Sequence, residues 1–147
     1  MKRGKLNILI ENLQSLTADK QIDDALQIIK SHADELLDLN IDQMMHGIDS
    51  TGKKLEPYRD PKYAAAKRQL NPRGVRDYRL TGAFHRDMYL DTRQFPVTFD
   101  SSNYKTPRLT EGDGEDIFGL TTENKEGPAM EILEPSFDAY YRRFLVV

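Results

Sequence analysis

The three histidines are the side chains of this chain best suited to acid–base or metal chemistry, because the chain contains no cysteine. His32 and His46 lie 14 residues apart on one predicted helix, about four turns, which is too far for them to share a metal ion. His85 comes shortly before Asp87, but no serine nucleophile in an elbow-type motif accompanies them. We therefore expect no enzymatic activity, no cofactor and no metal site. A hydrolase that uses His85 is the weakest of the alternatives.

A run of carboxylates over residues 111–116, EGDGED, contains the residue types that bind calcium. The run lacks the alternating ligand spacing and the distal glutamate of a calcium-binding loop. Its glycines stand among carboxylates, which would repel phosphate. We expect residues 101–116 to form a polar loop that is mobile in the free protein and ordered only by a neighbour.

Residues 50–79, called the basic segment below, contain nine Lys/Arg and three Asp/Glu in a chain whose net charge is −3. Acidic segments flank it on both sides. The candidate partner-binding residues in it are Lys53, Lys54, Arg59, Lys67, Arg68, Arg73 and Arg76. Three tyrosines are interleaved with these cations, a composition that can line a nucleic-acid path.

Three alternatives are open for the basic segment: an acidic protein surface, nucleic acid, or an ordinary solvated surface. We favour a protein partner, because the cations are spread over a predicted loop, helix and turn and match no named nucleic-acid-binding motif. On this interpretation Lys67 and Arg68 are exposed. Reversing both to glutamate would then impair assembly and leave the fold intact.

The length of 147 residues suits one domain, with a helical part over 1–48 and an α+β part over 49–147. No stretch of 18 apolar residues occurs, so we expect no membrane span. The absence of cysteine excludes disulfides and thiolate catalysis and is typical of assembly in a reducing cytoplasm.

Apolar spacing predicts two of the helices that position these residues, and a cap signal predicts a third. The first covers 4–16 and the second runs without a break over about 20–46, after an N-cap near Thr17 and before a stop at Gly47. A third follows Asp60-Pro61 and covers 61–70.

The second half of the chain is predicted to hold a small antiparallel sheet and a closing helix. Leu80-Thr81-Gly82 is predicted to form a tight turn before a short helix, in which Thr81 caps the helix and Gly82 turns the backbone. Alternation predicts strands in 87–94 and 96–101. A last helix covers 122–145, and Pro135 is expected to kink or split it. The predicted fold class is α+β.

The order of several short motifs resembles that of a known family. Gly52-Lys53-Lys54-Leu55-Glu56-Pro57-Tyr58 precedes Tyr63-Ala64 and Lys67, and then come Leu80-Thr81-Gly82, the strand pair, Phe118-Gly119-Leu120 and the last helix. Over residues 47–145 this order resembles the tail-completion, or virion-morphogenesis, proteins of tailed bacteriophages. Leu55 stands where many members of that family have tryptophan.

The resemblance implies a structural virion protein at the head–tail junction: a neck or connector protein, a tail-completion protein, or a ring or adaptor protein. It implies a ring of copies that contacts portal, connector and tail proteins, with packaged DNA as a possible further partner, and assembly in the host cytoplasm. The alternative from a different class is a nucleic-acid-binding accessory protein that uses residues 50–79.

Overall fold

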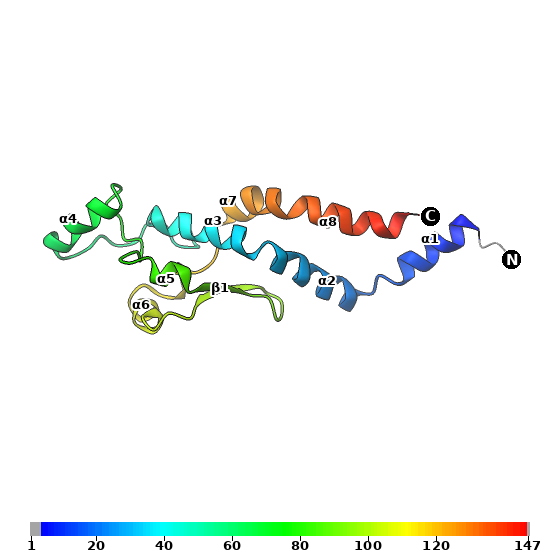
Figure 1. Ribbon diagram of the computed structural model, residues 1–147, viewed down its shortest axis with the longest axis horizontal. Helices are drawn as coiled ribbons and strands as arrows, with labels where there is room; N and C mark the ends of the chain where they lie inside the picture. The colour runs from blue at the N-terminus through cyan, green and yellow to red at the C-terminus, as the bar shows by residue number, and fades with distance from the viewer. Residues whose placement is uncertain (1–3, 147) are drawn as a thin grey trace.

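The computed structural model describes residues 4–146. The helices are α1 (Lys5–Gln14), α2 (Ala18–Ser31), α3 (Ala33–Met45), α4 (Pro61–Leu70), α5 (Ala83–Arg86), α6 (Thr106–Asp113), α7 (Thr122–Asn124) and α8 (Met130–Leu145). The strands are β1 (Met88–Asp91) and β2 (Thr98–Ser101). The molecule is elongated, with α4 at one end and α1 at the other, and α8 lies alongside α2 and α3 (Figure 1).

The predicted single helix over 20–46 is wrong, because the chain breaks at His32 into α2 and α3. His32 has φ −109° and ψ 16°, outside helical values. Its ring contacts Glu35 Oε1 and, on α8, Ser136 Oγ, each at 2.8 Å. The other boundaries agree with the sequence. Thr17 Oγ1 accepts a hydrogen bond from the Lys20 amide at 3.2 Å, and Gly47 follows the end of α3 with φ +67°.

The closing helix has the predicted extent, but Pro135 does not split it. The helix runs through α7, a π-helical turn over Lys125–Ala129 and then α8, without interruption up to Leu145. Pro135 lies exposed inside α8. The carbonyl that loses a donor there belongs to Glu131, which is also exposed and can be hydrated instead.

The fold is α+β, with N-terminal helices, a small antiparallel sheet and a long C-terminal helix. In the sheet Met88 pairs with Ser101 and Asp91 with Thr98. The turn that precedes the sheet is confirmed, but Gly82 rather than Thr81 is the N-cap of α5. Gly82 has φ +84°, and Thr81 Oγ1 accepts a hydrogen bond from the Ala83 amide at 3.3 Å.

The expectation of a polar loop over 101–116 is also wrong. The segment holds α6 and a 3₁₀ turn over Glu115–Ile117. The buried side chain of Asn103 fixes the turn just before α6. Its Nδ2 donates to Asp87 Oδ2 at 2.7 Å, and its Oδ1 accepts from the Lys105 amide at 3.1 Å. Polar residues therefore order this segment by bonding to partners elsewhere in the chain.

The core consists of two adjoining apolar clusters joined by residues 117–120. One is built around Met44, Phe84, Met88 and Ile117, and the other around Leu36, Leu120 and Ala129. No helix within residues 4–146 combines the length and apolar character needed to cross a membrane.

Asn40 and Gln43, both buried on α3, hold residues 117–120 against the core. Asn40 pairs with the backbone of Gly119 in both directions: Oδ1 accepts from the amide at 3.0 Å, and Nδ2 donates to the carbonyl at 3.1 Å. Gln43 Nε2 donates to the same carbonyl at 3.0 Å. Gly119 has φ +102°, a backbone conformation that favours glycine.

Candidate partner-binding site

The candidate partner-binding cations lie toward the α4 end of the molecule and fall into two groups. Most of them are exposed, namely Lys53, Lys54, Arg59, Arg68 and Arg73. Lys67 and Arg76 instead turn inward and form ion pairs. The exposed group can meet a partner, whereas the inward pair shapes the segment itself.

Lys67 is buried, so the expectation that it is an exposed charge is wrong. Its side chain is 2% exposed and its Nζ lies 2.7 Å from Oδ1 of Asp77, whose side chain is 0% exposed. Asn71 Nδ2 donates to Asp77 Oδ2 at 3.0 Å, and the Arg79 amide donates to Oδ1 at 2.9 Å. Burial alone would raise the pKa of Asp77, but these hydrogen bonds outweigh it and leave the pKa below its usual 3.8. The carboxylate of Asp77 is therefore ionised at neutral pH.

Arg76 ties the basic segment to α6. Its Nη1 lies 2.5 Å from Asp113 Oδ1, and Tyr78 Oη donates to Asp113 Oδ2 at 3.0 Å. The sequence had placed Asp113 in a solvated acidic run. No local signal identifies it as the partner of Arg76, which lies 37 positions earlier in the chain.

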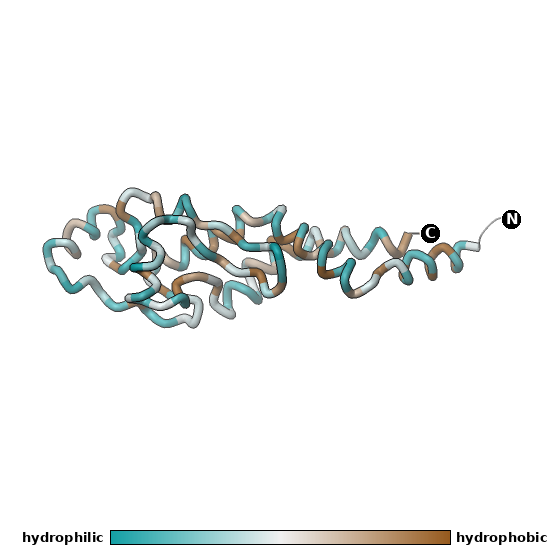
Figure 2. Tube along the Cα trace, turned by 90° about the horizontal axis from the view of Figure 1, so that it is seen from below, coloured by the Kyte–Doolittle hydropathy of each residue, from teal (hydrophilic) through white to brown (hydrophobic). Residues whose placement is uncertain are grey.

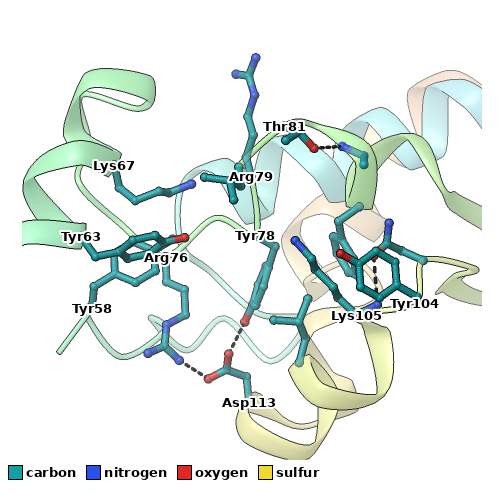
Figure 3. Close-up of a pocket in the computed structure, with 15 residues that line it drawn as sticks. Tyr58, Tyr63, Lys67, Arg76, Tyr78, Arg79, Thr81, Tyr104, Lys105 and Asp113 are labelled. Carbon is teal, nitrogen blue, oxygen red and sulfur yellow. Dashed lines mark hydrogen bonds and ion pairs between the residues drawn. The ribbon is translucent and has the colours of Figure 1, made fainter. Parts of the chain in front are cut away.

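A cavity of about 400 Å³ opens between α4, the segment after it and α6 (Figure 3). It brings together the interleaved tyrosines and cations of the basic segment with residues of α6 and of the turn before it. The lining consists of Tyr58, Tyr63, Lys67, Arg76, Tyr78, Arg79, Leu80, Thr81, Ala83, Phe84, Asn103, Tyr104, Lys105, Leu109 and Asp113.

Aromatic rings form the walls of this cavity. Tyr58 and Tyr63 meet edge to face, with ring centroids 5.0 Å apart. Tyr104 stands on the other side and is 83% exposed. Figure 3 shows Tyr78 between these two sides. Burial raises the pKa of Tyr58 to about 12 and that of Tyr78 further still, so both rings are neutral at physiological pH.

Tyr78 has a backbone conformation that is rare for a bulky residue. Its φ of +58° makes it the one non-glycine residue with positive φ in the described part of the chain. Its hydroxyl is held by Asp113, and its ring packs against Phe84 with centroids 5.8 Å apart. Such a conformation persists only where surrounding contacts enforce it, and here it directs a ring into the cavity.

The cavity is cationic. Lys67, Arg76, Arg79 and Lys105 line it, and Asp113 is the one carboxylate in its lining. Arg79 and Lys105 are exposed, and neither forms an ion pair with another residue of 4–146. Two cations thus organise the walls and two others remain available to an anion.

His85 belongs to the support of the buried pair. It is 9% exposed, and its Nε2–H donates to the carbonyl of Asp77 at 2.8 Å. Asp87 bonds to Asn103 instead. Within residues 4–146, no three His, Asp or Glu side chains lie close enough together to hold a metal ion. The arrangement around His85 is a structural hydrogen bond rather than an acid–base pair.

We expect stability to fall as the pH drops from 7.5 to 5.5, and His85→Gln to reduce that fall. Burial lowers the pKa of His85 below its usual 6.5. The unfolded chain therefore takes up a proton near pH 6.5 while the folded chain resists it, so the stabilisation present above that pH is lost below it. The Asp77 contribution is lost only below pH 3.8. Urea unfolding of both proteins at the two pH values measures the difference, and an unchanged pH dependence in the variant would contradict the assignment.

The opposite end of the molecule carries exposed apolar side chains, called the apolar arm below. They are Leu6, Ile10, Leu13, Ile22, Tyr141, Leu145 and Val146. Leu6, Ile10 and Leu13 follow helical spacing, so they share one face of α1, and no residue of α1 is buried. Apolar residues recur along this end of the chain in Figure 2. The sequence predicted the helix, but it did not predict that this face would be left exposed by the rest of residues 4–146.

Comparison of the chain with protein-family models, with curated proteins and with solved structures gave no match.

Proposed function

We propose that this protein is a structural virion component at the head–tail junction of a tailed bacteriophage, where several copies form a ring that joins the portal or connector to the tail. The observation that carries the proposal is the apolar arm. The order of motifs over residues 47–145 supports a location at the head–tail junction, and the apolar arm supports assembly with other chains.

An exposed row of large apolar side chains indicates an interaction surface. Leu6, Ile10 and Leu13 are 67%, 43% and 46% exposed, and α1 contacts α8 through its other side. A surface of this kind is covered when α1 meets another copy or a neighbouring virion protein.

Charge separation supports contacts between unlike surfaces of neighbouring copies. The exposed cations gather toward the α4 end, while Asp34, Glu35, Asp38 and Asp42 lie exposed along α3. Contact between two different surfaces generates a closed ring when the rotation between copies closes. The protein would then contact the portal or connector on one side and the tail on the other. Catalysis and bound cofactors have no part in this proposal.

We expect the purified chain to form a multi-copy ring and Leu6→Glu combined with Leu13→Glu to leave it monomeric. Burying the two introduced carboxylates in an apolar contact is unfavourable. Light scattering after gel filtration gives the mass, and circular dichroism checks the fold. The matched control is Met130→Glu, which alters a methionine that is 48% exposed and lies outside both the apolar arm and the basic segment, and it should leave the ring intact.

The virion location needs a second measurement. Electron cryomicroscopy of particles should show several copies of the chain around the tail axis, and the double variant should yield heads without tails. A monomeric wild-type chain would overturn the ring, and particles that lack the protein would overturn the location.

A further inference from the structure

We propose that the tyrosine-lined cavity binds a nucleotide unit, a planar base together with its phosphate. This binding site goes beyond the structural role, which needs no small ligand and no single strand. The source of the unit is a free nucleotide or one residue of a single-stranded nucleic acid.

The rings of the cavity fit the base. Tyr58 and Tyr63 form a fixed pair on one side, and Tyr104 stands on the lip opposite them (Figure 3). Tyr104 is 83% exposed, and its one ring contact within residues 4–146 is with Lys105, whose Nζ lies 5.6 Å from the ring centroid. Aromatic rings that flank a cationic cavity are the usual platform for an unpaired base, since every base offers a flat face.

The available cations fit the phosphate. In Figure 3 the amine of Lys105 points toward Tyr78 inside the cavity, whereas the side chain of Arg79 extends away from the tyrosine rings. Asp113 would oppose an anion, but Arg76 and Tyr78 occupy its two oxygens. The positive charge of Lys105 is therefore available inside the cavity, and Arg79, which also belongs to the lining, adds positive charge nearby.

The size of the cavity favours a single unit over a duplex. A volume of about 400 Å³ lies within the range of about 300–1,000 Å³ that small-ligand sites have. A double helix cannot enter such a cavity. An acidic peptide would satisfy the cations, but it would leave the tyrosine faces without a planar group to stack on, so we favour the nucleotide.

Calorimetric titration of the full chain with thymidine monophosphate, a ten-residue oligothymidylate, inorganic phosphate and a polyglutamate peptide tests the proposal. We expect the nucleotide or the oligonucleotide to bind more tightly than phosphate or the peptide. Tyr104→Ala and Lys105→Gln should each weaken that binding by about tenfold, the order expected for one lost stacking or charge contact. Both residues are exposed, so neither change threatens the fold.

The matched controls are Tyr89→Ala and Lys54→Gln, which alter an exposed tyrosine and an exposed lysine outside the cavity. Both should bind as the unaltered chain does. A preference for the oligonucleotide over the monophosphate identifies a single strand as the source, and equal affinities identify the free nucleotide; either outcome supports the site. The proposal is overturned if neither thymidylate binds, if phosphate or polyglutamate binds as tightly, or if Lys54→Gln weakens binding as much as Lys105→Gln.

Discussion

Lys67→Met is expected to lower the free energy of unfolding by about 3–5 kcal/mol, because it leaves the charge of Asp77 buried without its partner. Lys67 and Asp77 are 2% and 0% exposed, and 2.7 Å separates Nζ from Oδ1. Methionine is close to lysine in length, so the change removes the charge while keeping most of the packing. Urea unfolding at pH 7 measures the loss.

Lys62→Met is the matched control for this change. Lys62 lies in the first turn of the same helix and is exposed, so its replacement should alter stability by no more than about 0.5 kcal/mol. Adding Asp77→Asn to Lys67→Met should recover part of the loss, since the unpaired charge is then gone. A loss below about 1 kcal/mol in Lys67→Met, or an equal loss in the control, would show that the pair does not stabilise the fold.

Because Lys67 is buried, charge reversal at Lys67 cannot be used to test whether the basic segment binds a partner. Reversing Lys67 would unfold the segment, and the result would say nothing about partners. Arg59, Arg68 and Arg73 are exposed, so charge reversal at these positions examines assembly without disturbing the buried pair.

Asn40→Leu is expected to cost about 1–3 kcal/mol, the usual cost of leaving a buried polar group unsatisfied. Asn40 is 0% exposed, and its Oδ1 is the acceptor for the Gly119 amide, at 3.0 Å. The Gly119 carbonyl would still bond to Gln43, so the amide carries the loss. Thermal and urea unfolding both report it.

Asp38→Leu is the appropriate comparison for Asn40→Leu. It introduces the same residue two positions earlier on the same helix, at an exposed position, and should change stability by no more than about 0.5 kcal/mol. If Asn40→Leu were as stable as the unaltered chain, the pairing with Gly119 would not be what holds residues 117–120 in place.

Local patterns predicted the parts of the fold that local chemistry determines. The helix over 61–70 agrees with α4, where Asp60 Oδ1 accepts from the amides of Lys62 and Tyr63. The strand pair and the turn at Gly82 were predicted for the same reason: turn residues and alternation act over a few positions.

The errors arose where distant residues decide the outcome. The break at His32 coincides with a contact to Ser136, 104 positions later, and the order of 101–116 depends on Asp87 and Arg76. In the candidate site, the number of basic residues in the sequence predicted a cationic surface. It could not show that Lys67 pairs with the buried Asp77. Spacing placed tyrosines among the cations. The cavity also needs Tyr104 and Lys105, which lie outside the basic segment.

The lack of buried side chains in α1 has a consequence for how the molecule opens. Segments that bury little apolar surface detach at a free-energy cost well below that of global unfolding. α1 is held to the rest of the chain by its contacts with α8, including a hydrogen bond of 3.1 Å from Asn12 Nδ2 to the carbonyl of Val146. This helix can therefore detach from α8 while both core clusters stay folded. A neighbouring molecule that binds the detached helix would become linked to this protein without unfolding it.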